Sequence, residues 1–184
     1  MSRYTVRPIK KEDLLLILQW RNSERVHSQM LTDHFLTWEE HYQWFCRMKE
    51  NPISRNLIFL YQDRPIGYIG YTEYDEERHQ CAPSAYLGET DVPIDAGIIL
   101  LYFAVDYAFS VLKMKRLETS IFEKNRQARQ INTFLGYHHL WDKDALCWKN
   151  EKQEKVNRYA ITYDEWDKCK KKVQKRWAPF KQSD

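Results

Sequence analysis

Residues 86–137 constrain the fold most, because glycines and changes of hydrophobic period divide this segment into alternating elements. Three of the five glycines of the chain lie at predicted element ends: Gly88, Gly97 and Gly136. Residues 98–112 are apolar at nearly every position, and a helix that is apolar on all sides is a buried one. Residues 115–122 alternate between apolar and polar side chains, which is the period of a strand. The segment therefore predicts a buried helix followed by a strand.

A second helix is predicted after Asn125, where the period changes again. Ala128, Ile131 and Leu135 fall on one helical face, and Gly136 stands where a left-handed residue would end the helix. Strand, glycine-containing turn, buried helix, strand and helix describe a βαβ unit. This arrangement places a ligand site where the buried helix begins.

Short motifs in this segment and near the N-terminus follow one another in a specific order and spacing. They are Asp91-Val92-Pro93, Gly97, Tyr107-Ala108-Phe109, Asn125, Ala128, Gly136-Tyr137, Trp20-Arg21-Asn22, Met30 and Trp38-Glu39-Glu40-His41. With these motifs, residues 4–166 resemble the GNAT N-acetyltransferases. Within that family they resemble the branch that acetylates a UDP-linked 4-amino-dideoxy sugar in pseudaminic acid biosynthesis. The resemblance implies a mixed α/β (α+β) fold. Its central, mostly antiparallel twisted sheet would have six to seven strands, flanking helices and a splayed pair of central strands.

The rest of the chain completes this order of elements. Strands are predicted at residues 4–9, 56–61, 65–72 and 82–87, and a closing hairpin at 139–162 with a polar turn at 150–155. Helices are predicted at residues 14–20 and 38–49. Their caps are Asp13 and a capping box from Thr37 to Glu40, and Asn51-Pro52-Ile53 ends the second helix. Asp164 would cap a last helix.

Composition limits the class of protein. With 184 residues, 43% of them hydrophobic, the chain can form one core, so we expect a domain at residues 1–163. Residues 164–184 would be its basic helical extension, either a solvated helix or an anion- or partner-binding tail. The four cysteines are scattered without a C-x-x-C pair, which argues against a zinc site or a disulfide framework. No metal is expected.

Charge and hydropathy exclude further classes. A net charge of +3 does not by itself imply nucleic acid, and the basic residues of the last helix have no interleaved aromatics. The first thirty residues do not resemble a signal peptide, and no apolar run is long enough to span a bilayer. We therefore expect a cytoplasmic protein with a small-molecule substrate and without nucleic-acid or membrane partners. The oligomeric state is left open, with a homodimer as one option.

The resemblance implies acetyl-CoA as the acetyl donor. Its pyrophosphate would rest on backbone N–H groups of the loop before the buried helix, formed here by Val92, Pro93, Ile94, Asp95, Ala96 and Gly97. The loop departs from the family at Asp95, where a glycine is usual. The isolated motif is also compatible with a plain helix-entry turn. Backbone N–H groups of Tyr86, Leu87 and Gly88 would polarise the thioester carbonyl.

Three polar residues are the catalytic candidates. Asn125 matches an asparagine that the family places beside the acetyl-CoA arm, a role compatible with capping the helix that follows. Asn132 stands where many relatives have a proton-donating tyrosine, and its amide has no acidic proton to give. It lies on an apolar helix face, so it either hydrogen-bonds the sulfur or is a satisfied core amide. Glu73, His41 or a water chain would deprotonate the amine.

The resemblance also assigns the acceptor site. Arg21 and His41 would bind the phosphate or nucleotide end, and Thr72 and Glu73 would lie near the sugar. Asn22 and Met30 complete the set. Two alternatives remain open: an N-terminal acetyltransferase of the ribosomal-protein type, and a non-catalytic module that binds CoA or a nucleotide.

Overall fold

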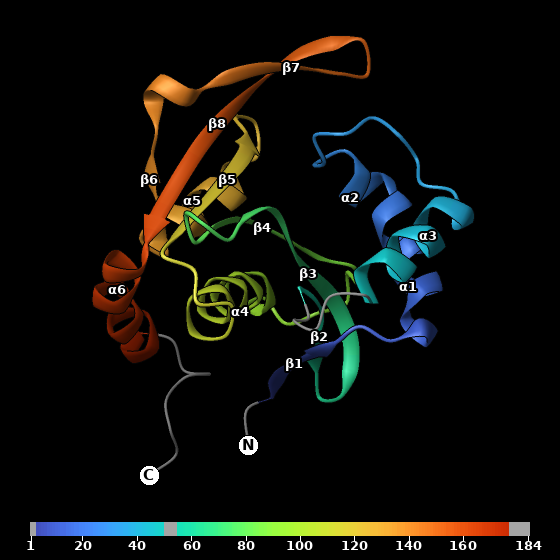
Figure 1. Cartoon of the computed structure of the whole chain (residues 1–184), viewed down its shortest axis with the longest axis horizontal. Helices are drawn as coiled ribbons and strands as arrows, with labels where there is room; N and C mark the ends of the chain where they lie inside the picture. Colours follow the sequence, from blue (N-terminus) through green and yellow to red (C-terminus); the bar gives the residue numbers. More distant parts are fainter. Residues whose placement is uncertain (1–2, 50–54, 177–184) are drawn as a thin grey trace.

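The computed structural model describes residues 3–49 and 55–176, and an eight-stranded sheet runs through this part of the chain (Figure 1). Its spatial order is β1-β2-β3-β4-β5-β8-β6, and β7 also pairs with β8. The strands are β1 (Tyr4–Pro8), β2 (Asn56–Tyr61), β3 (Arg64–Asp75), β4 (Gln80–Leu87), β5 (Arg116–Phe122), β6 (His138–His139), β7 (Ala145–Lys149) and β8 (Lys152–Thr162). The helices are η1 (Lys11–Asp13), α1 (Leu14–Asn22), α2 (Glu24–His27), α3 (Trp38–Lys49), α4 (Ala96–Ser110), α5 (Arg126–Phe134), η2 (Trp141–Lys143) and α6 (Tyr163–Arg176).

Alternation along β2 gives the sheet two buried faces. Leu57 and Phe59 point to the face covered by α4, in the main core. Ile58 and Leu60 point to the opposite face and pack with residues of α1 and α3 in a second cluster. Because successive side chains of a strand alternate between faces, a strand buried on both faces is an almost continuous apolar run. Asn56–Tyr61 is such a run.

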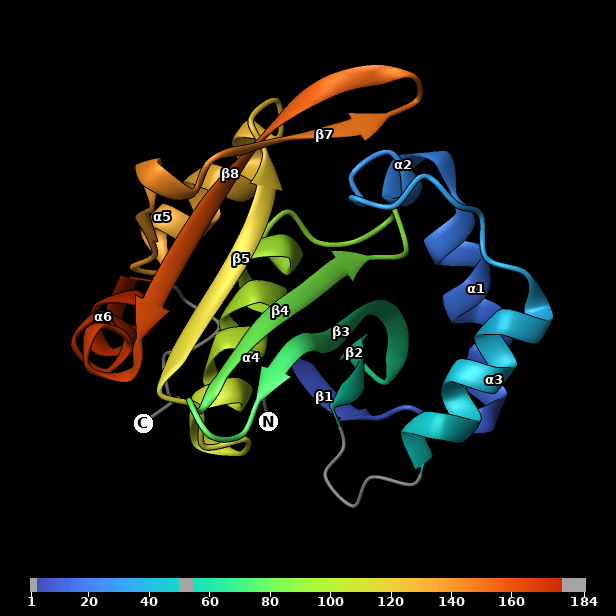
Figure 2. The same ribbon diagram turned by 45° about the horizontal axis from the view of Figure 1, so that its top comes forward.

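The centre of the sheet is splayed between β4 and β5. These parallel strands pair only through Gln80 with Arg116 and Cys81 with Leu117, and then diverge (Figure 2). The N–H of Gly88 donates to Ile66 in β3, so by alternation the odd-numbered residues of β4 face β5. Pro83 is the next such residue after Cys81, and it has no N–H to continue the ladder. The mostly antiparallel mixed α/β fold with splayed central strands is therefore confirmed.

Several local predictions are confirmed by hydrogen bonds. Asn125 caps α5 by accepting from the Ala128 N–H at 3.1 Å, and Gly136 follows that helix with φ +99°. In the capping box, the Glu40 N–H donates to the Thr37 hydroxyl at 3.2 Å. The Glu40 carboxylate accepts from the Thr37 N–H at 2.8 Å.

Of two further predicted caps, one has the right position and one is wrong. Asp13 is the N-cap residue of α1, but its carboxylate accepts from the Lys10 N–H at 2.7 Å and so closes the 3-10 turn before α1, without a side-chain bond to α1 itself. Asp164 lies inside α6, whose cap is Thr162. The Thr162 hydroxyl accepts from the Glu165 N–H at 3.4 Å, and the Glu165 carboxylate accepts from the Thr162 N–H at 2.7 Å.

The closing hairpin is tighter than predicted. Asn150 and Glu151 have positive φ values of 49° and 60°, which is the requirement of a two-residue hairpin turn. Strand β8 therefore starts at Lys152 instead of after residue 155. The sheet has eight strands in the described residues against the six to seven expected, and its shortest is the two-residue β6. The predicted breaker at Asn51-Pro52-Ile53 lies outside the described residues.

Helix α6 packs on the main core, with Trp166 and Val173 each 2% exposed. The division into residues 1–163 and 164–184 stays a prediction, and residues 177–184 lie outside the described part. In the two described ranges, every helix is too short or too polar to cross a lipid bilayer.

Candidate active site

A cavity of about 480 Å³ opens between α3 and the face of β2–β4 that α1 and α3 cover; we call it the α3 pocket. Four of the six predicted substrate residues line it: Arg21, Met30, His41 and Thr72. The remaining lining residues are Ile17, Leu36, Glu40, Gln43, Trp44, Arg47, Asn56, Tyr68, Gly70, Tyr71, Ser84 and Tyr86. The structure therefore brings together residues that are up to 51 positions apart in the predicted set.

Arg21 brings a partly buried positive charge to the pocket. Its Nη2 donates to the Thr32 hydroxyl at 2.6 Å, while its Nη1 is buried and has no hydrogen-bond partner among the described residues. Burial lowers the pKa of Arg21, but a guanidinium stays charged at neutral pH. A cation that is removed from water and has an unused hydrogen-bond donor costs free energy unless an anion pairs with it. The pocket therefore favours a negatively charged ligand.

His41 brings an unpaired ring nitrogen to the same pocket. The side chain is 4% exposed and stacks on Trp44 with ring centroids 5.0 Å apart. The backbone carbonyl of Leu14 accepts a hydrogen bond from the ring, and Nε2 is buried with no partner in the described ranges. Burial lowers the pKa of His41, so its neutral form dominates at pH 7. Nε2 then carries a free lone pair, on a residue that lines the pocket.

Sequence reasoning missed other lining residues, although their spacing was informative. On α3, the missed residues Glu40, Gln43 and Arg47 recur at the three- and four-residue spacing of one helical face. On the strands, Gly70 with Thr72 and Ser84 with Tyr86 follow the two-residue period. Given His41 on its helix and Thr72 on its strand, these periods predict which nearby residues share the same face.

Asn22 and Glu73 do not line the pocket. Asn22 donates to the Leu36 carbonyl at 2.8 Å and accepts from the Leu36 N–H at 3.0 Å, so it fixes a pocket wall. Glu73 sits at an irregularity in the β3–β4 pairing with φ 49°, and both carboxylate oxygens contact Arg158 of β8, at 2.5 and 3.5 Å. Glu73 is therefore engaged in an ion pair with Arg158.

The end of β4 is clamped from the α1 and α2 side. A Cβ on Gly88 would lie 1.9 Å from the Trp20 ring, so glycine is required there by a close side-chain contact. Trp20 Nε1 donates to Glu89 at 2.9 Å. Arg25 donates to the carbonyls of Leu87 and Gly88 at 3.0 and 2.7 Å. By alternation the N–H of Leu87 faces the splay, whereas those of Tyr86 and Gly88 face β3.

The loop at residues 92–97, which we call the α4 entry loop, leads into the N-terminus of α4. Gly97 and Ile98 are in the first turn of the helix, where backbone N–H groups have no intrahelical acceptor. A Cβ on Gly97 would meet only Leu87 Cδ1, at 3.9 Å, among the described residues, so the space beside this backbone is open. Asp95 Oδ1 accepts from the Tyr4 hydroxyl at 2.5 Å, so its side chain points to β1.

The two asparagines of the second helix are engaged locally. Asn125 forms the α5 cap described above. Asn132 is 6% exposed, and its Nδ2 donates to the Ala128 carbonyl one turn earlier at 2.8 Å. This bond satisfies part of its amide within α5, in the manner of a packed polar residue.

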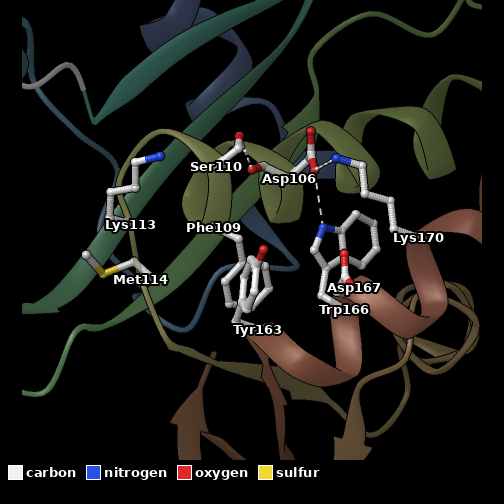
Figure 3. Close-up of a pocket in the computed structure, with 9 residues that line it drawn as sticks. All are labelled: Asp106, Phe109, Ser110, Lys113, Met114, Tyr163, Trp166, Asp167 and Lys170. Carbon is white, nitrogen blue, oxygen red and sulfur yellow. Dashed lines mark hydrogen bonds and ion pairs between the residues drawn. The ribbon is translucent and has the colours of Figure 1, made fainter.

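A second cavity, of about 440 Å³, lies between α4 and α6 (Figure 3). Two of its charged lining groups pair with each other: Asp106 Oδ1 accepts from Lys170 at 2.5 Å and also from Trp166 Nε1 at 3.2 Å. It contains none of the predicted site residues and has no unpaired buried side chain in the described ranges. The α3 pocket is therefore the candidate site. No group of three or more His, Cys, Asp or Glu side chains in the described residues is placed to hold a metal ion.

Comparison with known proteins identifies similar acetyltransferases. A family model described as an acetyltransferase (GNAT) domain matches residues 3–138. Acetyltransferase PseH of Campylobacter jejuni is 24% identical over 146 residues, which cover 77% of this chain and 88% of that protein.

Two solved structures share the fold. Spermidine N-acetyltransferase from Vibrio cholerae, in complex with CoA and spermine, has a TM-score of 0.82 at 16% identity and covers 90% of this chain and 99% of its own. The putative acetyltransferase yncA from Salmonella typhimurium, solved with acetyl-CoA, has a TM-score of 0.72 at 16% identity and covers 89% and 95%. These cofactors agree with the expected acetyl-CoA donor. Because the family model spans most of the chain, this protein belongs to the GNAT acetyltransferases.

Proposed function

We propose that the protein transfers an acetyl group from acetyl-CoA to the amine of a nucleotide-linked amino sugar by direct attack on the thioester. The observation that carries the proposal is Arg21 in the α3 pocket, where a half-buried guanidinium has an unused Nη1. The diphosphate of such an acceptor would accept charge-assisted hydrogen bonds from this guanidinium. The similarity to the Campylobacter protein PseH supports the same acceptor class.

The pocket charges argue against a polyamine acceptor, although one structural neighbour is a spermidine N-acetyltransferase. Arg21 and Arg47 both line the pocket, and among the described residues Glu40 is the only acidic one that lines it. Its carboxylate is already shared by Thr37 and His34, both at 2.9 Å. A polycation would meet two arginines and one occupied carboxylate, whereas an anion would meet two cations.

The donor would be held mainly by backbone. The residues present fit a pyrophosphate: the first N–H groups of α4 are unused by the helix, and the open space at Gly97 admits close approach. The Leu87 N–H faces the splay, where it would donate to a thioester carbonyl. Acetyl-CoA supplies the activated thioester. The side chains of Asp95 and Asn125 serve the loop and the helix cap.

His41 fits the role of proton acceptor better than Glu73. Its Nε2 is unprotonated and unpaired in the pocket, while Glu73 is held by Arg158. General bases work best with a pKa near the operating pH, and a histidine whose pKa is lowered by burial is in its basic form at pH 7. His41 would accept the amine proton directly or through one water.

The test is release of free thiol from acetyl-CoA with a UDP-linked 4-amino-dideoxy sugar as acceptor. The matched controls are the same sugar nucleotide without the amine, spermidine, and a peptide with the N-terminus of a ribosomal protein. Turnover with the amino sugar alone supports the proposal. Turnover only with the peptide, together with no thermal stabilisation by UDP, would instead establish the N-terminal acetyltransferase alternative.

A further inference from the structure

Lys149, the last residue of β7, is a buried lysine outside the candidate site. Its side chain is 2% exposed, and Nζ donates to the Thr32 carbonyl at 2.7 Å and to Asp33 Oδ1 at 3.0 Å. Lysine is almost never buried without a partner, because removing its charge from water is costly. Both of its partners lie 116–117 positions away, in the segment between α2 and α3. Lys149 thus joins two distant parts of the chain.

The turn that follows Lys149 adds a second connection. The Asn150 N–H donates to Asp33 Oδ2 at 2.7 Å, so the hairpin tip engages both oxygens of one carboxylate. The left-handed turn of Asn150 and Glu151 aims that N–H away from the β7–β8 ladder. In Figures 1 and 2 the β7–β8 hairpin reaches past the rest of the sheet to the segment after α2. The hairpin tip therefore links β7 and β8 to the segment between α2 and α3.

The segment that the tip holds is a wall of the α3 pocket. Met30 and Leu36, on either side of Thr32 and Asp33, line the pocket. Thr32 is held from two directions: Lys149 bonds its carbonyl, and Arg21 bonds its hydroxyl at 2.6 Å. The hydroxyl also orients the guanidinium whose Nη1 remains unused. A shift of Thr32 would therefore move both the wall and Arg21.

We propose that Lys149 is a positioning residue for the acceptor: through Thr32 and Asp33 it fixes the wall at residues 30–36 and the direction of Arg21. This inference rests on the proposed function, because it takes the α3 pocket as the acceptor site. Lys149 acts through Thr32 and does not touch the acceptor. Its loss is expected to weaken acceptor binding and to leave the donor end of the molecule unchanged.

The test compares Lys149→Met with Lys152→Met. The first change keeps the length of the side chain and removes its charge. The second removes the same charge from an exposed residue that pairs with Lys149 across the turn. For Lys149→Met we expect the KM of the amino-sugar nucleotide to rise about tenfold, since small displacements of binding groups have effects of this size or larger. The kcat and the KM of acetyl-CoA should stay within about twofold, and Lys152→Met should match the parent.

Two further variants probe the same connection. Asp33→Asn weakens the ion pair from its exposed end, and Thr32→Val breaks only the bond to Arg21. Each should raise the acceptor KM. The double variant Asp33→Asn with Lys149→Met should lose less binding free energy than the sum of the losses in the two single variants, because the effects of residues in one contact are not additive. A purely structural Lys149 would instead lower the apparent kcat as the folded fraction falls and leave the KM of both substrates unchanged.

Hydrogen exchange separates failure of this inference from failure of the proposed function. The amides of Met30 and Leu36 donate to His27 and to Asn22, and they should exchange faster in Lys149→Met in the absence of any substrate. Unchanged exchange at both amides would overturn the inference whatever the acceptor is. Faster exchange, with no turnover of amino-sugar nucleotides by the parent, would refute the proposed function and leave the positioning role intact. If Lys149→Met does not fold, the Asp33→Asn exchange and KM values decide.

Discussion

The α3 pocket and the donor end, at β4 and the α4 entry loop, differ in how their polar side chains are satisfied. In the pocket, Arg21 Nη1 and His41 Nε2 are buried without partners among the described residues. At the donor end, the side chains expected to act are already engaged: Asp95 with Tyr4, Asn125 and Asn132 within α5. A site that recognises its ligand through side chains keeps them free, whereas a site that uses backbone N–H groups tolerates side-chain change. Acceptor choice should therefore depend on a few side chains, and donor binding should not.

The largest effect is expected for His41→Gln. If Nε2 is the proton acceptor, kcat/KM for the amino-sugar nucleotide should fall about 100-fold, which is the lower end for general-base catalysis. Because burial holds the pKa of His41 below 6.5, the parent should be fully active above about pH 6.5 and lose activity as the pH falls through the folded-state pKa. The variant should lack this acidic limb. A limb that persists in His41→Gln would assign the base elsewhere.

Arg21→Met should have the next largest effect. A charge-assisted hydrogen bond to a buried group contributes about 1.5–3 kcal/mol, so the acceptor KM should rise about 10- to 150-fold with the KM of acetyl-CoA unchanged. Arg78→Met is the matched control, because Arg78 is 82% exposed and is not among the residues that line the pocket. Steady-state kinetics with each substrate varied in turn gives both constants. Equal losses for the two substrates would contradict the separation of the two regions.

Asn132→Ala should have a small effect, within about threefold on kcat. One amide N–H is spent on the Ala128 carbonyl, and a thiolate with an ordinary pKa of about 8.5 leaves without a strong acid. The free energy of unfolding should fall by about 1 kcal/mol from the lost hydrogen bond. Single-turnover kinetics and urea unfolding measure the two quantities. A fall in kcat above tenfold would show that the donor end also depends on a side chain.

Asp95→Gly should have the smallest effect on function. A carboxylate at a pyrophosphate loop suggests repulsion, and from the sequence alone removing it should tighten acetyl-CoA binding. The structure turns this side chain toward β1, where burial and the carboxylate of Asp95 together raise the pKa of Tyr4. We therefore expect the Kd of acetyl-CoA to change less than about twofold, and the protein to lose about 1 kcal/mol of stability, or about 2–4 °C in Tm. Calorimetric titration at low and high salt would reveal a residual repulsion.

The sequence was most informative where a short period or a special residue determines structure. The buried α4, the strand β5, the Asn125 cap and Gly136 follow from hydrophobic period and capping chemistry, and the positions of these elements were right to within two residues at most ends. Asp164 was misplaced because several oxygens near the start of α6 compete for the same orphan N–H groups, and only three-dimensional geometry selects among them. The resemblance placed Arg21 and His41 in one pocket, a contact between distant segments that no local pattern contains.

What the sequence left out is the partner of each polar side chain. Asp95 and Tyr4 are 91 positions apart, and Glu73 and Arg158 are 85 apart. Such pairs depend on the tertiary structure, in which β1 lies beside the α4 entry loop and β8 lies next to β5, separated from β3 by β4 and β5 in the sheet order. The roles of Glu73, Asn125 and Asn132 in catalysis stay predictions, since their observed contacts are within the protein.

The short pairing of β4 with β5 also leaves the two halves of the sheet weakly coupled through their backbones. Beyond Cys81 the strands share no ladder, so a change in the angle between the two halves of the sheet breaks no backbone hydrogen bond between them. The bending axis would run through Gln80–Cys81 and Arg116–Leu117. The strand ends farthest from this axis, where the donor would enter, would move most. Such collective motions belong to the microsecond to millisecond range, which is faster than typical turnover. The distance between β4 and β5 in the splay could therefore change while the two residue pairs stay hydrogen-bonded.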